Sequence, residues 1–344
     1  MTPLADNFQR ARALCSESFA RTSHAEVPFP SPDGTPRVPA SIPPRSALAR
    51  ERHPLALQSL APCHLCLHRC GVDRTTGPAG RCHAGPNARC FSAQTDVSDE
   101  LELLPSFAIS LSGCNLRCDF CITGGPSWNP AAGSDVSPHD LASHVRAAFH
   151  RGARTVMILG GEPTIHLPAL LELVAALPDN VPIVLKTNAC FSEAARPLLF
   201  GLFDVWLPDL KFGNPDCAQR LAGIPRSNHP AGIQPESKPT APESPGSTDY
   251  WATVTSNLIW MAGEGNGADL IVRHLLMPGH IECCWAPAAR WLSRELPRVK
   301  VSLRDGYWPT WHAARHPEFR APLPRAERDR AMSLAREHRL HLVP

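Results

Sequence analysis

Apolar and polar residues follow two different patterns along this chain, and the change comes near residue 106. Beyond that point, short apolar runs rich in β-branched residues alternate with stretches of helical spacing, a pattern typical of βα units. Strands are expected at 107–111, 155–159, 183–185, 205–207, 270–276 and 299–303, and helices at 138–150, 167–177, 193–199 and 286–296. We therefore predict an α/β fold with a parallel sheet, open or barrel-like, whose chemistry lies at the carboxyl ends of the strands.

Two proline-rich segments lack this periodicity. Residues 22–57 and 226–248 are rich in Pro and Ser, and proline neither donates to a β-ladder nor continues a helix. We expect both to be extended or disordered, and we expect a short helix at 5–20 before the first. The predicted organisation is an N-terminal segment at 1–59, a cysteine-rich metal-binding segment at 60–92 and a main domain at 100–340 with a disordered insertion at 226–248.

The composition excludes several classes of protein. The net charge is +2, from 34 basic and 32 acidic residues without charged blocks, so no nucleic-acid-binding surface is predicted. No apolar run approaches the roughly 18 to 20 residues of a membrane span, and the N-terminus lacks a secretory signal pattern. We therefore expect a cytoplasmic protein that binds neither nucleic acid nor membrane. In that reducing compartment, the 13 cysteines are expected to be metal ligands or redox groups rather than disulfides.

Three cysteines with the spacing CxxxCxxC follow the first expected strand, namely Cys114, Cys118 and Cys121. Thiolates select zinc or an iron–sulfur cluster, and three of them in one loop can converge on one centre. A structural zinc site needs a fourth ligand, whereas a four-iron cluster with three ligands keeps one iron open to a substrate. A zinc knuckle completed from elsewhere in the chain remains the alternative.

A second motif, Gly160-Gly161-Glu162-Pro163, follows the strand expected at 155–159. Two glycines at a strand end let the backbone come close to a ligand. A tight turn without function explains this motif nearly as well.

Together, the two motifs resemble the radical S-adenosylmethionine (radical SAM) enzymes, which carry CxxxCxΦC after the first strand and a GGE-type loop after the second. The resemblance implies a 4Fe-4S cluster on Cys114, Cys118 and Cys121, with S-adenosylmethionine on the fourth iron. It also implies that Phe120 lies near the adenine and that the loop of Gly160, Gly161, Glu162 and Pro163 contacts the methionine amino group.

Within that superfamily, residues 60–340 resemble pyruvate formate-lyase activating enzymes and their uncharacterised relatives, which implies a partial (β/α)6 TIM-like barrel. Asn188, Asp209 and Lys211 match strand-end motifs of that group and are implied to bind the cofactor, the last two at the ribose and carboxylate. The chain departs from the group in two places. The loop at 122–128 lacks the usual Gln-Asn, which leaves the substrate open, and Lys186 stands where an acidic residue is common.

The cysteine-rich segment also resembles those relatives, which carry CxxCxxxC and GxC ahead of the core. Four thiolates at these spacings can close a tetrahedral site, so we predict a metal site with either zinc or an auxiliary iron–sulfur cluster. Its ligands would be Cys63, Cys66, Cys70 and Cys82, with His64, His68 and His83 as possible substitutes.

The remaining cysteines and two histidines favour simpler interpretations. Cys15, Cys90, Cys190, Cys217 and the pair Cys283–Cys284 are expected to be small buried hydrophobic residues. His274 and His280 are expected to be hydrogen-bonded core residues rather than catalytic acids or bases.

The resemblance implies a radical SAM oxidoreductase. Reduced flavodoxin or ferredoxin would supply one electron, S-adenosylmethionine would be cleaved to methionine and a 5′-deoxyadenosyl radical, and that radical would abstract hydrogen from a substrate. A glycyl radical enzyme or another protein is one candidate substrate, and a small molecule or peptide is another. A zinc-stabilised binding protein without catalysis is the alternative from a different class.

Overall fold

The computed structural model describes residues 43–224, 249–263 and 268–344. The predicted helix at 5–20 and the whole of the predicted insertion at 226–248 lie outside the described residues.

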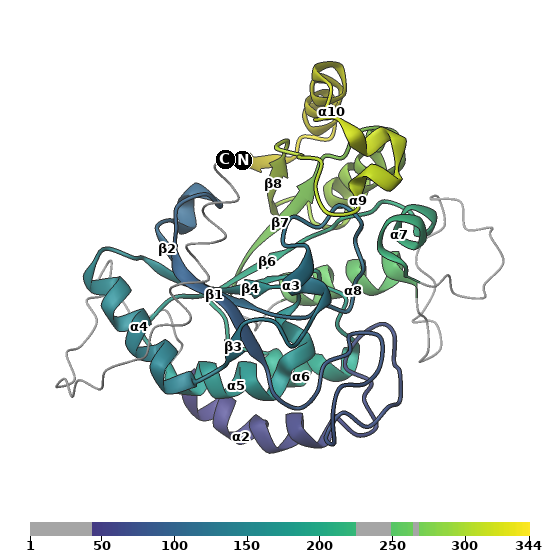
Figure 1. Ribbon diagram of the computed structural model, residues 1–344. Helices are drawn as coiled ribbons and strands as arrows, with labels where there is room; N and C mark the ends of the chain where they lie inside the picture. Colours follow the sequence, from purple (N-terminus) through teal and green to yellow (C-terminus); the bar gives the residue numbers. More distant parts are fainter. Residues whose placement is uncertain (1–42, 225–248, 264–267) are drawn as a thin grey trace, which may run out of the picture.

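The described residues form a nine-stranded sheet with the strand order β3-β1-β2-β4-β5-β6-β7-β8-β9 (Figure 1). From β2 to β9 all neighbours are parallel, while β1 is antiparallel to both β2 and β3. The strands are β1 (Arg89–Asp96), β2 (Ser106–Leu111), β3 (Ser134–Asp135), β4 (Thr155–Gly160), β5 (Ile183–Thr187), β6 (Val205–Pro208), β7 (Asp269–Leu275), β8 (Lys300–Arg304) and β9 (His341–Val343).

The sheet is open, because β3 and β9 form its two edges. The pairing of β6 with β7 is short, at Val205↔Asp269 and Trp206↔Leu270, and is continued by an isolated bridge between Asp209 and Arg273. A largely parallel, open sheet of βα units agrees with the predicted partial barrel.

All ten predicted strands and helices of the main domain are present. Their helices are α4 (Pro138–His150), α5 (Leu167–Ala176), the short turn η3 (Glu193–Ala195) with α6 (Arg196–Leu199), and α9 (Ala286–Glu295). The Ser137 hydroxyl accepts a hydrogen bond from the Asp140 N–H and caps α4, as expected for Ser before Pro at a helix start.

Other elements were not predicted. They are the strands β1, β3 and β9, the helices α3 (Gly125–Trp128), α7 (Pro215–Ala222), α8 (Tyr250–Ala262) and α10 (Arg325–Glu337), a π-helical turn η4 (Ile281–Trp285), and the 3₁₀ turns η1 (Leu101–Leu103), η2 (Pro163–His166), η5 (Ala313–Arg315) and η6 (Pro317–Arg320).

The prediction of an extended or disordered chain up to residue 57 is wrong for its last part. Residues Arg45–Gln58 form helix α2, which contains Pro54 and packs against α5. Ser46 donates from its N–H and its hydroxyl to Asp179, and Ala49 and Ala56 are fully buried. The helix is stabilised by this packing rather than by its own sequence pattern.

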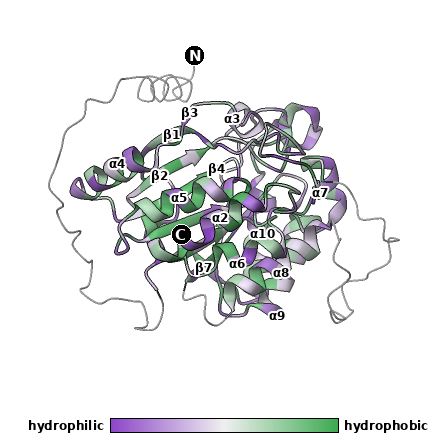
Figure 2. Cartoon of the chain, turned by 90° about the horizontal axis from the view of Figure 1, so that it is seen from below, coloured by the Kyte–Doolittle hydropathy of each residue, from purple (hydrophilic) through white to green (hydrophobic). Residues whose placement is uncertain are grey.

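The two faces of the sheet differ in character. Helices α2, α5 and α6 cover one face (Figure 1), where Ile158, Leu185 and Trp206 belong to the large buried core. Figure 2 shows hydrophobic residues along the strands and α5, whereas α4 carries both kinds of residue. The opposite face of the sheet is called the inner face here. It carries a smaller apolar layer of Leu103, Met157, Val184, Leu207 and Ile271.

Within the described residues, no helix is both long and apolar enough to cross a membrane.

Candidate active site at the carboxyl ends of the strands

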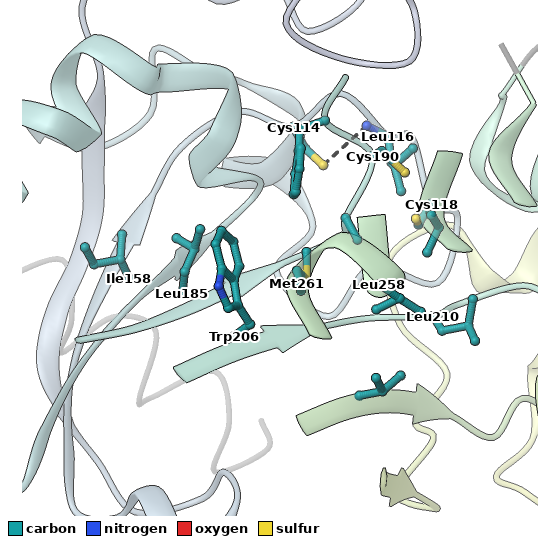
Figure 3. Packing of buried hydrophobic residues seen from close by; sticks show 14 of the residues in the cluster. Cys114, Leu116, Cys118, Ile158, Leu185, Cys190, Trp206, Leu210, Leu258 and Met261 are labelled. Carbon is teal, nitrogen blue, oxygen red and sulfur yellow. Dashed lines mark hydrogen bonds between the residues drawn. The ribbon is translucent and has the colours of Figure 1, made fainter. Parts of the chain in front are cut away.

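The three motif cysteines lie in the loop that follows β2. Cys114 and Cys118 are buried, and Cys121 is half-buried. The backbone of this loop is bound to α7, since the N–H groups of Arg117 and Asp119 donate to the carbonyls of Ala222 and Leu221 at 3.0 and 2.9 Å. In Figure 3 the sulfurs of Cys114 and Cys118 lie at the rim of the buried core. The three cysteines therefore share one loop at the carboxyl end of β2, and their joint binding of a cluster stays a prediction.

The three motif sulfurs are not gathered as closely as the ligands of a bound zinc ion would be. Around a tetrahedral zinc with Zn–S bonds of about 2.3 Å, sulfurs lie about 3.8 Å apart. In the described part of the chain, only one group of three or more ligating side chains has its ligand atoms within 4.8 Å of one another, and it does not include Cys114, Cys118 or Cys121.

The environment of these thiols explains why they need a metal to ionise. Burial raises the pKa of the Cys118 thiol to about 12, although the nearby Lys211 opposes the shift. Burial, followed by the charge of Glu162, also raises the pKa of Cys114. Metal binding deprotonates such thiols. The Leu116 N–H, at 3.3 Å, and the Asn188 side-chain amide, at 3.6 Å, are placed to donate to the Cys114 sulfur.

The loop after β4 packs directly on the cysteine loop. The N–H of Gly161 donates to Leu111 O at 2.8 Å, and that of Glu162 donates to Gly113 O at 2.9 Å. A Cβ on Gly161 would lie 1.9 Å from Gly113 O, so a side chain at this position would separate the loops. Gly160 has φ of +127°, a conformation that favours glycine. The glycines are thus required by loop packing whether or not a ligand is bound.

The Glu162 carboxylate points into the protein. Its side chain is fully buried, with Oε1 accepting from the Thr164 N–H and from the hydroxyls of Thr164 and Thr187. Oε2 accepts from the Asn188 N–H at 2.6 Å. Burial raises the pKa of Glu162, and these hydrogen bonds oppose the rise. The carboxylate therefore joins the ends of β4 and β5, a role that the sequence motif did not reveal.

Asn188 connects this carboxylate to the cysteine loop. Its side-chain amide donates to Asn115 Oδ1 at 2.8 Å and also faces Cys114. The Asn115 Nδ2 atom is buried and has no hydrogen-bond partner among the described residues. An unused buried donor beside the thiols is a group that a bound cofactor can satisfy.

Asp209 and Lys211 lie together after β6. Their side chains form an ion pair with an Nζ–Oδ2 distance of 2.7 Å. Burial alone would lower the pKa of Lys211, but the Asp209 charge raises it above its ordinary value. The Lys211 N–H donates to the Tyr250 hydroxyl at 2.8 Å, which holds the loop against α8.

Phe120 lies in an aromatic layer beside the cysteine loop. Its ring is edge-on to Phe212 and Phe319, at centroid distances of 6.0 and 5.7 Å. The layer shields one side of the site from water.

The four N-terminal cysteines also come together. Cys63, Cys66, Cys70 and Cys82 line one small cavity with Arg74 and with Ile165 of η2. The segment packs on the loop after β5 through an isolated bridge between Cys66 and Phe191. Of the histidines considered as ligands, His68 instead places Nε2 2.8 Å from Asn115 O. No three of these four cysteine sulfurs lie within 4.8 Å of one another.

One cluster was missed by the sequence interpretation. Cys217, His280, Cys283 and Cys284 have ligand atoms that all lie within 4.8 Å of one another. The expectation of buried cysteines is confirmed for Cys217 and Cys284, but the sequence did not show that they lie beside Cys283 and His280. The adjacent pair Cys283–Cys284 was the only signal, because about 60 residues separate it from Cys217. His274 does behave as expected, since its buried Nδ1 lies 2.6 Å from Leu210 O.

Comparisons with known proteins find similarity to the radical SAM superfamily. The family model of the radical SAM superfamily matches residues 109–229. The chain is 28% identical over 287 residues to an uncharacterised protein of Methanocaldococcus jannaschii, covering 82% of this chain and 76% of that protein. It is 41% identical over 127 residues to 7-carboxy-7-deazaguanine synthase of Halobacterium salinarum, covering 36% and 47%. The solved structure of Streptococcus suis SuiB bound to S-adenosylmethionine is similar with a TM-score of 0.44 and 14% identity, covering 67% of this chain and 47% of that chain.

Proposed function

We propose that the chain is a radical SAM enzyme that cleaves S-adenosylmethionine reductively and abstracts hydrogen from a substrate, because the radical SAM family model matches residues 109–229. The observation that carries this proposal is the meeting of three thiols, the Gly160–Pro163 loop and the Asp209–Lys211 pair at one end of the sheet. Superfamily members use a 4Fe-4S cluster and S-adenosylmethionine as cofactors.

The residues present fit both cofactors. Cys114, Cys118 and Cys121 would hold the cluster, since they share one loop and the Cys114 sulfur faces two N–H donors. The free Asn115 amide would serve a bound group in the same place. When bound, such a cluster supplies an electron to S-adenosylmethionine, whose S–C5′ bond breaks to give a 5′-deoxyadenosyl radical.

The protein's own residues position the reactants and exclude water. The Glu162 side chain points into the protein and holds the loop after β4 in place. The backbone of residues 160–163 would therefore contact the methionine amino group. Lys211 provides a cation for the cofactor carboxylate, and Asp209 keeps it protonated. The layer of Phe120, Phe212 and Phe319 gives the adenine an apolar wall.

A protein is the substrate class that we propose, with a glycyl radical enzyme as its candidate. Ile122 follows the third cysteine directly and is 77% exposed. Trp311 is 41% exposed and packs over Gly124 in the same loop, where a Cβ would lie 2.9 Å from its ring. Large apolar side chains exposed beside the cluster loop favour a macromolecular partner over a small molecule. Flavodoxin or ferredoxin is the proposed electron donor.

The chemistry is tested with anaerobically reconstituted full-length protein. Wild type should bind iron and convert S-adenosylmethionine to methionine and 5′-deoxyadenosine when dithionite is added. Cys118→Ala should abolish that cleavage, while Cys90→Ala, which removes a buried cysteine in β1, should retain it. Colourless protein that holds only zinc, or full cleavage by Cys118→Ala, would contradict the proposal. A glycyl radical signal in electron paramagnetic resonance with a candidate protein would identify that protein as the substrate. If no such signal appears and hydrogen is taken from a small molecule instead, a protein substrate is excluded.

We also propose that the N-terminal cysteines hold a second iron–sulfur cluster rather than zinc. The four cysteines line a common cavity, and no three of their sulfurs lie within 4.8 Å of one another. Arg74 is buried and faces Cys63 Sγ at 3.6 Å, and the Arg81 N–H donates to Cys70 Sγ at 3.5 Å. A buried cation and an N–H donor stabilise the negative charge of a thiolate-bound cluster.

The metal content distinguishes the two sites. With two four-iron clusters, wild type should contain about eight iron atoms per chain, and Cys70→Ser should contain about four. Cys70 is exposed, so its substitution disturbs the core least. Unchanged iron with a loss of zinc in Cys70→Ser would show that this site binds zinc.

A further inference from the structure

A third group of ligating side chains lies behind the aromatic layer of the active site. Cys217 is in the first turn of α7, and His280, Cys283 and Cys284 are in or beside the π-helical turn η4 that follows β7. Cys217, His280 and Cys284 are buried, at 7%, 4% and 0% exposure, and Cys283 is half-buried. No part of the proposed radical chemistry uses these residues.

The distances within this group match one tetrahedral ion. The Cys217 and Cys283 sulfurs are 3.8 Å apart, and those of Cys283 and Cys284 are 4.0 Å apart. His280 Nδ1 lies 3.4, 3.2 and 3.7 Å from the sulfurs of Cys217, Cys283 and Cys284. Zinc with three sulfur ligands at about 2.3 Å and one nitrogen at about 2.0 Å places sulfurs about 3.8 Å apart and sulfur to nitrogen about 3.5 Å.

We propose that Cys217, His280, Cys283 and Cys284 bind a structural zinc ion. Four protein ligands leave no open position, which is the property of a structural site rather than a catalytic one. The tight spacing separates this site from the two wider cysteine groups, which are suited to clusters.

The second nitrogen of His280 has the partner that a zinc ligand needs. Without metal, Arg220 donates to His280 Nε2 at 3.0 Å, so the ring proton lies on Nδ1 and faces the sulfurs. Zinc binding moves that proton to Nε2 and releases the thiol protons to solvent. The Glu318 carboxylate accepts from Arg220 at 2.6 Å and lies 3.6 Å from Nε2, so it would have to move closer to accept from a protonated Nε2.

The position of the site gives the ion a structural task. It ties α7, which holds the cysteine loop, to η4. A Cβ on Gly213 would lie 2.3 Å from Cys284 O, so the loop after β6 also touches this turn. The His280 ring packs on Phe319, with a centroid distance of 5.3 Å, and Phe319 packs on Phe120. The ion would therefore hold the wall of the active site in place.

The test measures metals in full-length protein purified without oxygen. Wild type should hold one zinc per chain in addition to its iron. Cys283→Ser should lose that zinc with unchanged iron and a lower melting temperature, while Cys90→Ser should keep it. X-ray absorption at the zinc edge of wild type should give three sulfurs at about 2.3 Å and one nitrogen at about 2.0 Å.

Three results would overturn the proposal. These are zinc that is retained in Cys283→Ser, a wild-type zinc with four sulfur ligands, and a wild type that takes up no zinc when zinc is supplied. The zinc measurement does not depend on cleavage of S-adenosylmethionine, so failure of this proposal and failure of the proposed function are distinguishable.

Discussion

At the scale of single residues, Glu162 belongs to the glycine-rich motif, yet its side chain binds other protein groups instead of pointing toward a ligand. Its carboxylate takes four hydrogen bonds from three residues of two neighbouring strand ends. Two of these donors are backbone N–H groups, of Thr164 and Asn188, which cannot turn away. The residue thus sets the distance between the loops that flank the cluster cysteines.

Glu162→Gln should lower the free energy of unfolding by about 2 kcal/mol. The new side-chain NH2 group would face the N–H and hydroxyl donors that now bind the carboxylate, and buried donors would lose their acceptor. The affinity for S-adenosylmethionine should fall as well, since the loop after β4 loses its support. Chemical unfolding and equilibrium binding measure the two effects. Glu172→Gln is the control, because that side chain is 51% exposed and should be neutral. Equal stability of the two variants would contradict the role given to Glu162.

At the scale of elements, helix α2 illustrates structure that its own sequence does not predict. It contains a proline and has no clear apolar stripe, yet it is anchored at its start by Arg45 and Ser46. Arg45 pairs with Asp204 and donates to the carbonyls of Asp179 and Val181. Small buried residues, Ala49 and Ala56, let α2 lie close to its neighbours.

Ala56→Glu should therefore destabilise the protein by about 3 kcal/mol, because it places an unpaired charge in a buried contact. Glutamate is a good helix former, so the loss would report packing rather than helix propensity. Leu57→Glu, at a neighbouring position that is 42% exposed, serves as the matched control and should be close to neutral. Thermal and denaturant unfolding of the two variants give the comparison, and similar losses would argue against a packed α2.

At the scale of the whole molecule, a layer of charges joins the strands across the inner face. Lys186 of β5 lies 2.6 Å from Asp99, and Arg273 of β7 pairs with Asp99 and Glu100. Ser302 of β8 donates to Glu100 at 2.8 Å. The backbone pairing of β6 with β7 is short, and the sheet is open. The ion pairs and hydrogen bonds of this layer add side-chain links between the strands. Lys186 stands where the activating enzymes commonly have an acidic residue, and in this protein it has Asp99 as a structural partner.

Asp99→Asn should cost about 3 kcal/mol at neutral pH, because Lys186 and Arg273 lose a buried counter-charge. Burial opposes ionisation of Asp99, but the two cations hold its pKa below the ordinary 3.8. The stabilisation is therefore present above that value and is lost as the pH falls. Denaturant unfolding of the variant and of Asp305→Asn should differ, because Asp305 forms an ion pair at a half-exposed site. Equal losses would contradict the importance of the layer.

The sequence by itself determined the βα order and the cluster motif, because both are local. Six strands and four helices of the main domain follow from periodicity, and Cys114, Cys118 and Cys121 share one loop. Only the tertiary structure decided that α2 is a helix, since packing on α5 stabilises it. It also brought Cys217 beside His280 and turned Glu162 inward. Such contacts join residues far apart in sequence, and their energy exists only once the sheet has placed the strand ends together.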